Sequence, residues 1–219
     1  MTPRNKQPYE AVVFDLDGTL LDTLPSVYQC FGDAVKPFLG KRPSNKEIQD
    51  RFGPADHRIV ADWVGPEHAQ EAVEILYKAY DSALDTMLVF PGIQALLEAL
   101  QERGIPLGLF TGRGRASTDW LLKERVLGGF FQATVSGDEV SSPKPSPEGL
   151  LQVLDQLGVS PGNAVYVGDS ILDFRAAAQA PTDFIGVTWG TQVTRALEDA
   201  GARLVHDLPA LGGVLLARD

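Results

Sequence analysis

The chain has 219 residues, of which 44% are hydrophobic, so it has enough apolar side chains to bury a sizeable core. Its 19 basic and 29 acidic side chains give a net charge of −10, which disfavours nucleic acid and anionic membranes as partners. The single cysteine, Cys30, excludes an internal disulfide. No apolar run approaches the roughly 20 residues of a membrane span, and the polar leader at residues 1–8 lacks the apolar stretch of a secretory signal. We therefore expect a cytoplasmic protein that is a monomer or a homodimer.

Short apolar and β-branched runs that lead into polar residues or glycine predict the buried strands of a parallel sheet. The first run, YEAVVF at residues 9–14, leads directly into two aspartates and a glycine. Further strands are expected at residues 105–110, 131–136, 163–167 and 183–187, and a weaker pattern covers 202–205.

Between these strands, apolar residues recur at helical spacing. Helices are expected at residues 92–103, 147–157 and 170–180, and the second of these carries Leu150, Leu151, Leu154 and Leu157, which we assign to one buried face. Strands that alternate with helices predict an α/β fold with a doubly wound, mostly parallel, Rossmann-like sheet.

The alternation breaks between residues 23 and 89, where the sequence shows helical patterns but no good strand. Helices are expected at residues 24–38, 44–51, 56–63 and 66–84, separated by prolines and Gly-Pro pairs. We therefore predict a helical cap domain at 23–89, inserted into an α/β catalytic core made of 1–22 and 90–219.

Ligands of open α/β sheets bind at the carboxyl ends of the strands, so the polar residues that follow the predicted strands are the candidate site. One edge of the sheet collects four carboxylates, a hydroxyl and an ammonium group: Asp15, Asp17, Thr111, Lys144, Asp169 and Asp173. Carboxylate oxygens suit Mg²⁺, and there is no cluster of histidine or cysteine for a softer metal.

This set of residues is chemically suited to phosphoryl transfer. Mg²⁺ and Lys144 together would bind a phosphate, and Gly18 and the turn at Thr111-Gly112 let backbone amides approach an anion. One carboxylate can attack phosphorus and form an aspartyl-phosphate. A second carboxylate two residues further on can protonate the leaving group and later activate water.

Four segments resemble the four motifs of the haloacid dehalogenase-like hydrolase superfamily, in the same order. They are DLDGTL at 15–20, TGR at 111–113, the lysine of SSPKP at 144, and GDSILD at 168–173. The resemblance implies that Asp15 is the nucleophile and a magnesium ligand. It implies that Asp17 is the general acid and base, with its backbone carbonyl on the metal.

The resemblance also implies the remaining roles. Thr111 would hydrogen-bond the phosphoryl group, Lys144 would neutralise its charge and orient Asp15, and Asp169 would be a magnesium ligand. Asp173, also assigned to the metal site, would position Lys144 or a metal-bound water.

The insertion resembles the helical cap of the phosphoglycolate phosphatase and phosphoglucomutase type. Its specificity loop is expected near His57 and Arg58. The remaining candidates for contacts with substrate are Gly18, Thr19, Gly112 and Arg113, although a surface position is an equal alternative for Arg113.

The resemblance favours a phosphatase of small phosphorylated metabolites, with phosphoglycolate as the first choice. Pyrophosphate, sugar phosphates and nucleoside monophosphates stay open. Dehalogenases and phosphonatases of the superfamily lack the aspartate found here at Asp17. A phosphomutase would carry a histidine near residues 27–31, which read VYQCF. A phosphomutase is the main alternative, followed by a phospho-acceptor switch and a catalytically silent binding protein.

Several other polar and aromatic residues are assigned structural roles. Asp22 and Thr23 are expected at a hinge and helix start, and Ser170 at the start of a helix or in a ligand contact. Trp63, Tyr77 and Tyr80 fall at helical spacing and are expected in the core of the cap, and His68 and His206 on the surface.

Overall fold

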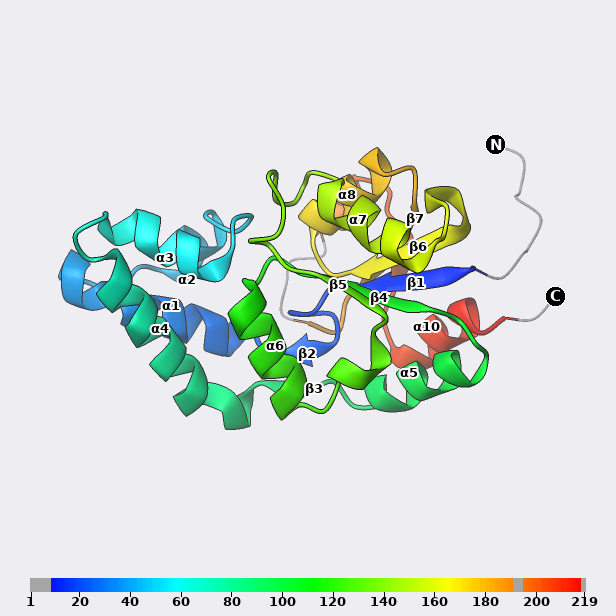
Figure 1. Ribbon diagram of the computed structural model, residues 1–219, viewed down its shortest axis with the longest axis horizontal. Coiled ribbons are helices and arrows are strands. Elements are labelled where there is room, and N and C mark those ends of the chain that lie inside the picture. Colours follow the sequence, from blue (N-terminus) through cyan, green and yellow to red (C-terminus); the bar gives the residue numbers. More distant parts are fainter. Residues whose placement is uncertain (1–8, 191–194, 218–219) are drawn as a thin grey trace.

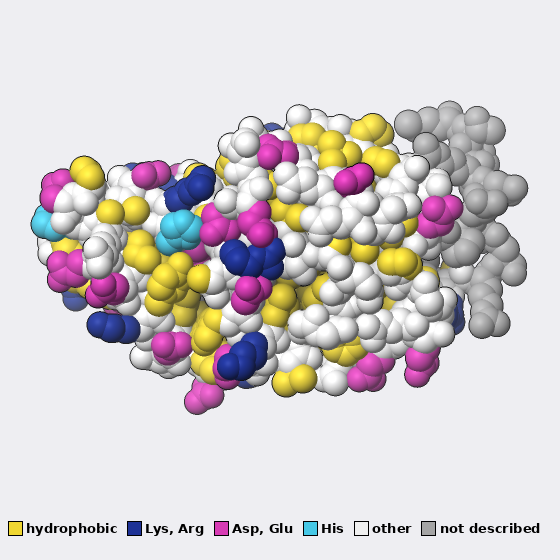
Figure 2. Space-filling model, viewed as in Figure 1, with side chains coloured by type: hydrophobic (Ala, Val, Ile, Leu, Met, Phe, Trp, Pro, Cys, Tyr) yellow, Lys and Arg dark blue, Asp and Glu magenta, His cyan; other side chains and the backbone are white. Residues whose placement is uncertain are grey.

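The computed structural model describes residues 9–190 and 195–217, and the leader expected at residues 1–8 lies outside these ranges. A sheet flanked by helices occupies one end of the molecule, and four helices, α1 to α4, occupy the other end (Figure 1). On the face shown in Figure 2, acidic and basic side chains are interspersed among the described residues. Among the helices of these residues, none has the length and apolar character to cross a membrane.

Six parallel strands form the main sheet, and all six predicted strands are confirmed within a few residues. The strand order is β5-β4-β1-β6-β7-β8, and every neighbouring pair is parallel. The strands are β1 (Ala11–Phe14), β4 (Leu107–Phe110), β5 (Ala133–Val135), β6 (Ala164–Gly168), β7 (Asp183–Val187) and β8 (Leu204–Val205).

The order of these strands reverses at β1, which has β4 on one side and β6 on the other. Such a switch point is where doubly wound sheets open a crevice for ligands. Phe14 at the end of β1 is in register with Val167 of β6, and the backbone N–H of Asp15 donates to the Val167 carbonyl at 2.9 Å. The sheet therefore brings the residues that follow β1 and β6 side by side.

Helices cover both faces of β1, which explains its continuous apolar sequence. Ala11 and Val13 pack with side chains of α7 (Glu148–Leu157) and α8 (Ile171–Gln179). Val12 and Phe14 belong to the cluster on the opposite face, which includes side chains of α5 (Ile93–Glu102) and α10 (Leu208–Leu215).

One prediction for α7 is wrong: Leu151 does not belong to its buried face. Leu151 is 39% exposed, whereas Leu150, Val153 and Leu154 are buried against the sheet. The buried stripe therefore runs through i, i+3 and i+4 from Leu150.

Two more helices of the core are α6 (Arg115–Glu124) and α9 (Arg195–Asp199). We did not predict α9 or α10, and the glycine pair at Gly212-Gly213 gives α10 a low helix propensity.

The inserted segment contains α1 (Leu24–Leu39), α2 (Asn45–Gln49), α3 (Asp56–Val64) and α4 (Ala69–Ala83), as expected. It is joined to the sheet domain by a short antiparallel ribbon of β2 (Leu21–Asp22) and β3 (Leu88–Val89). The strand β3 lies inside the range in which we expected only helices, and Asp22 lies in the ribbon. The chain thus leaves and re-enters the sheet domain at one place.

The two faces of α7 offer a matched test of this packing. Leu154 is 1% exposed, so Leu154→Ala should lower the free energy of unfolding by about 2–5 kcal/mol. Leu151→Ala, the same change on the exposed side of the same helix, should lower it by less than about 1 kcal/mol. Urea denaturation of both variants measures the two values, and equal losses would contradict the orientation of α7.

Candidate active site

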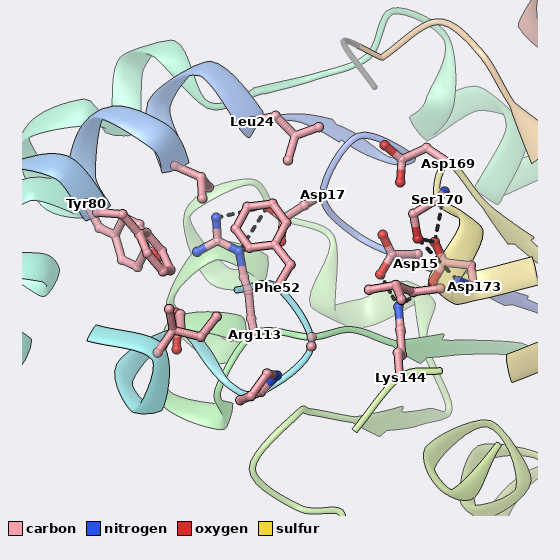
Figure 3. Close-up of a pocket in the computed structure, with 18 residues that line it drawn as sticks. Asp15, Asp17, Leu24, Phe52, Tyr80, Arg113, Lys144, Asp169, Ser170 and Asp173 are labelled. Atoms are coloured by element: carbon pink, nitrogen blue, oxygen red, sulfur yellow. Dashed lines mark hydrogen bonds and ion pairs between the residues drawn. The ribbon is translucent and has the colours of Figure 1, made fainter. Parts of the chain in front are cut away.

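Lys144 connects two of the predicted site carboxylates at the carboxyl edge of the sheet (Figure 3). Its Nζ donates to Asp15 Oδ1 at 2.6 Å and to Asp173 Oδ1 at 2.7 Å, and all three side chains are buried. Burial lowers the pKa of Lys144, but the charges of Asp15 and Asp173 outweigh this effect and raise it. Lys144 is therefore a protonated cation fixed between two carboxylates.

Asp173 is held in place by four neighbouring donors. Its Oδ1 also accepts a hydrogen bond from the Tyr166 hydroxyl at 2.9 Å. Its Oδ2 accepts from the Ser170 hydroxyl at 2.5 Å and from the Ser170 N–H at 3.1 Å. The bond from the Ser170 N–H and the bond from the Asp173 N–H to the Ser170 hydroxyl, at 3.2 Å, form the capping box at the start of α8. Both oxygens of Asp173 thus have protein partners, and the geometry suits it to positioning Lys144.

Negative charge accumulates beside this lysine. Asp15, Asp169 and Asp173 are buried and each places one oxygen within 4.8 Å of the others. Burial raises the pKa of Asp15 to about 7 and that of Asp169 well above its usual range, and the neighbouring carboxylates contribute to both rises. Lys144 alone does not balance this cluster, so a further positive charge would stabilise its ionised form.

The donor set fits a divalent cation. Asp169 Oδ2 is buried and has no hydrogen-bond partner among the described residues. Gly18, at a φ of +78°, lies so close that a Cβ there would be 2.1 Å from this oxygen. An unpaired buried carboxylate oxygen facing a glycine loop is suited to a hard ion with oxygen ligands, such as Mg²⁺.

The side chain of Asp17 points away from Asp15 and toward Arg113 (Figure 3). Arg113 Nε lies 3.0 and 2.8 Å from the two carboxylate oxygens, Nη2 lies 2.9 Å from Oδ1, and the Thr23 hydroxyl also donates to Oδ1. The Asp17 carboxylate therefore lies outside the cluster of Asp15, Asp169 and Asp173. Arg113 is only 4% exposed, so its alternative position on the surface is wrong.

The remaining core candidates surround this edge. Thr111 is fully buried, and its hydroxyl accepts from the Arg113 N–H at 3.2 Å. Gly112 lines the cavity described below. Thr19 is fully buried, and its hydroxyl has no partner among the described residues.

A cavity of about 120 Å³ lies between the sheet edge and the inserted helices. Asp15, Asp17, Arg113, Lys144 and Asp169 line its polar side. Its other wall is largely apolar and comes mainly from the inserted segment: Leu24, Val27, Phe31, Phe52, Ile59 and Tyr80. Tyr80 is buried, as expected for a core residue, but it also lines this cavity. Helical spacing alone does not distinguish a residue that packs in the core from one that lines a cavity.

His57 and Arg58 do not line the cavity, although we expected the specificity loop there. Arg58 is exposed, and the His57 ring lies 3.6 Å from Asp56. The neighbouring Phe52, Gly53, Pro54 and Asp56 do line it. Residues next to the expected pair thus line the cavity, but His57 and Arg58 themselves do not.

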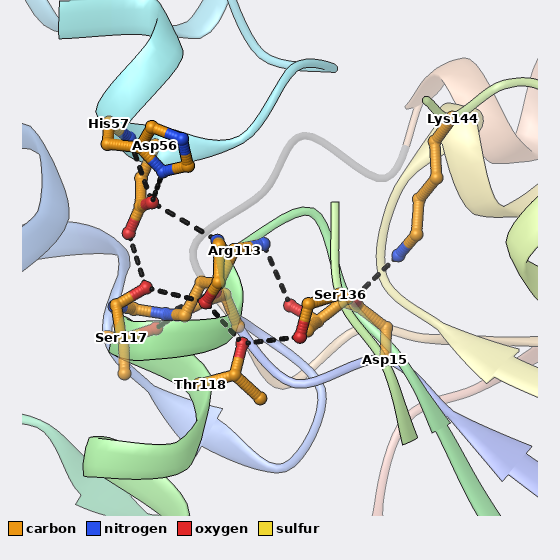
Figure 4. A network of polar contacts seen from close by, with 12 residues as sticks. Asp15, Asp56, His57, Arg113, Ser117, Thr118, Ser136 and Lys144 are labelled. Atoms are coloured by element: carbon orange, nitrogen blue, oxygen red, sulfur yellow. Dashed lines mark hydrogen bonds and ion pairs between the residues drawn. The ribbon is translucent and has the colours of Figure 1, made fainter. Parts of the chain in front are cut away.

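Asp56 joins the inserted segment to the first turn of α6, a contact that we did not predict (Figure 4). Its Oδ1 accepts from the N–H of His57 at 2.8 Å and of Gly114 at 3.1 Å, and its Oδ2 accepts from the Ser117 hydroxyl at 2.5 Å. Burial raises the pKa of Asp56, but the hydrogen bond to His57 and the charge of Arg113 outweigh it and lower the pKa.

This contact predicts a specific pH dependence. The lowered pKa of Asp56 adds stability above its usual value of 3.8, which is lost as the pH falls through the folded value. The hydrogen bond to Asp56 raises the pKa of His57 above its usual value of 6.5. The stability that protonated His57 contributes is therefore complete below pH 6.5 and is lost as the pH rises through the folded value. Asp56→Asn should therefore destabilise most between these two pH values, by about 1–3 kcal/mol.

The measurement is the free energy of unfolding of wild type and Asp56→Asn from pH 3 to 8. Asp62→Asn, at an exposed position of the same helix, is the control. A difference that does not change with pH would contradict an ionised Asp56 at this contact.

With this geometry in place, the chain can be compared with known proteins. Residues 12–187 match the family model described as haloacid dehalogenase-like hydrolase. The match includes all four motifs, from Asp15 to Asp173.

The chain is 30% identical to the phosphoglycolate phosphatase of Pseudomonas putida, over 91% of this chain and 77% of that protein. It is also 30% identical to the phosphoglycolate phosphatase of Escherichia coli K12, over 92% of each chain. The crystal structure of a hydrolase from Pseudomonas syringae superposes with a TM-score of 0.78 at 25% identity, over 90% of this chain and 93% of that one. By its motifs, its site geometry and these similarities, the chain belongs to the haloacid dehalogenase-like hydrolases.

Proposed function

We propose that this chain is a magnesium-dependent phosphatase that hydrolyses a small phosphate monoester through an aspartyl-phosphate on Asp15. The observation that carries the proposal is the buried Asp15 carboxylate at the end of β1, bound by Lys144 and adjacent to the unpaired oxygen of Asp169. The proposed nucleophile, the lysine and the carboxylate proposed to bind the metal all line one cavity, which supports this assignment.

In the first step, an oxygen of Asp15 attacks phosphorus and the bond from phosphorus to the leaving-group oxygen breaks. Lys144 holds Oδ1 at 2.6 Å, which leaves Oδ2 for the attack. The ammonium group also lies where it offsets the charge of the phosphoryl oxygens, and Thr111 and the backbone near Gly18 would supply hydrogen bonds to them.

Asp17 acts as the general acid and then as the general base. It donates a proton to the leaving-group oxygen, and it then removes a proton from the water that attacks phosphorus and releases Asp15. In the structure, Arg113 and Thr23 hold the Asp17 carboxylate away from Asp15. This role therefore requires the Asp17 side chain to turn toward the reacting groups when substrate binds.

Mg²⁺ would be held by Asp15, Asp169 and the backbone carbonyl of Asp17, with Asp173 acting through Lys144 because its own oxygens are occupied by donors. When bound, the ion supplies positive charge that stabilises the phosphoryl oxygens and keeps Asp15 ionised.

Phosphoglycolate is the proposed substrate, in line with the names of the Pseudomonas and Escherichia relatives. A phosphomutase is the second candidate, and the absence of histidine from residues 27–31 weighs against it. The apolar wall formed by the inserted helices would act as a cap that excludes water during the first step. We also propose that the enzyme works in the cytoplasm on a freely diffusing metabolite.

The nucleophile assignment is tested by phosphate release from phosphoglycolate and a panel of other monoesters. Asp15→Asn should lower kcat by roughly 10³-fold or more, because the amide cannot form the aspartyl-phosphate. A circular dichroism spectrum controls for folding. Release that persists in the folded variant would remove Asp15 as the nucleophile, and isomerised sugar phosphate without release would favour the mutase.

The metal assignment is tested without turnover. Mg²⁺ at 100 times its dissociation constant should raise the free energy of unfolding of wild type by about 2.7 kcal/mol, because it binds only the folded site. Asp169→Asn should lose most of this gain, whereas Asp155→Asn, an exposed carboxylate on α7, should keep it. Equal gains in all three proteins would place the ion elsewhere.

A further inference from the structure

Arg113 uses only part of its hydrogen-bonding capacity. A guanidinium group has five N–H donors on three nitrogens. Nε and Nη2 bind the Asp17 carboxylate, but Nη1 is buried and has no hydrogen-bond partner among the described residues. Buried donors are almost always paired in folded proteins, so an unpaired nitrogen beside a cavity indicates a position for a ligand atom.

The surroundings of Arg113 make this donor selective. The ring of Tyr80 faces the guanidinium, with its centroid 4.8 Å from Cζ. Apolar side chains such as Phe31, Phe52 and Ile59 line the same cavity. An apolar wall keeps the local dielectric constant low, which strengthens a charged hydrogen bond and makes an unpaired charge unfavourable.

Among the described residues that line this cavity, Arg113 is the cation with an unpaired nitrogen. Lys144 is the other basic residue among those that line it, and both Asp15 and Asp173 already engage its ammonium group. Arg113 and Asp15 line the same cavity, so one ligand in this cavity can contact both residues.

We propose that Nη1 of Arg113 binds a carboxylate carried by the leaving group of the phosphate ester. The inference rests on the proposed phosphatase function and specifies its substrate class as short phosphorylated carboxylic acids. A carboxylate matches this donor better than a second phosphate does. Once Asp17 has turned toward the reacting groups, one carboxylate balances the single positive charge of Arg113, whereas a dianion would leave negative charge unbalanced in an apolar cavity.

Two esters whose leaving groups differ only at the second carbon isolate this contact. Phosphoglycolate carries the carboxylate, and ethyl phosphate replaces it with a methyl group. The readout is the ratio of kcat/KM for the two esters in the presence of Mg²⁺. Loss of the Arg113–Asp17 ion pair affects both esters, so its effect cancels in the ratio.

Wild type should prefer phosphoglycolate, and Arg113→Met should lower the ratio by about 10- to 100-fold, as expected when a charged hydrogen bond is lost. Arg113→Lys, which keeps the positive charge but not the planar set of N–H donors of the guanidinium, should give an intermediate ratio. Arg115→Met is the control, because that guanidinium pairs with Asp119 and Glu139 and does not line the cavity. An unchanged ratio in Arg113→Met, with phosphate still released, would overturn the inference and leave the phosphatase proposal standing.

Binding separates this failure from failure of the phosphatase proposal. If wild type releases phosphate from neither ester, the phosphatase proposal fails. Calorimetric titration of phosphoglycolate into Asp15→Asn and Asp15→Asn/Arg113→Met then decides the role of Arg113. Binding that the second variant loses would support a carboxylate site at Arg113, and equal binding or no binding in both would overturn it.

Discussion

The site depends on one interaction, in which the ammonium group of Lys144 is bound between the carboxylates of Asp15 and Asp173. Each of these charges would be expensive to bury alone, and removing one partner of a buried pair typically costs several kcal/mol. The three residues are separated by 129 and 29 positions in the sequence, and only the order of strands at β1 brings them together. The ion pair and the topology of the sheet therefore support each other.

A second ion pair, between the buried Arg113 and the partly buried Asp17, lines the polar side of the same cavity. The two ion pairs differ in whether all their buried polar atoms have hydrogen-bond partners. Lys144 has two carboxylate partners, whereas Arg113 and Asp169 each keep one buried polar atom without a partner among the described residues. The unpaired atom of Arg113 is a donor and that of Asp169 is an acceptor. The cavity therefore suits a ligand that presents an anionic group to Arg113 and a bound cation to Asp169.

The sequence was most informative where local pattern and chemistry agree. The apolar runs located all six strands because parallel strands are buried on both faces, and the motifs identified Asp15, Lys144, Asp169 and Asp173 as neighbours at one edge. Sequence patterns alone could not predict what depends on contacts between distant segments. Tyr80 looks like any core aromatic residue until the structure places Arg113 over its ring, and His57 looks more functional than Asp56 until the structure buries Asp56 against α6.

The hydrogen bonds of Asp56 bear on how the inserted helices relate to the rest of the enzyme. The N–H of Gly114 and the hydroxyl of Ser117 belong to the first turn of α6, directly after the loop that carries Thr111 and Arg113. The acceptors of this turn come from both parts: Asp56 of the insertion binds Gly114 and Ser117, and Asp138 of the sheet domain accepts from the Arg115 N–H at 2.8 Å. The two parts are therefore not independently exchangeable modules: a foreign insertion grafted between β2 and β3 would have to supply its own acceptor for Gly114 and Ser117, or the loop that carries Thr111 and Arg113 would lose part of its support.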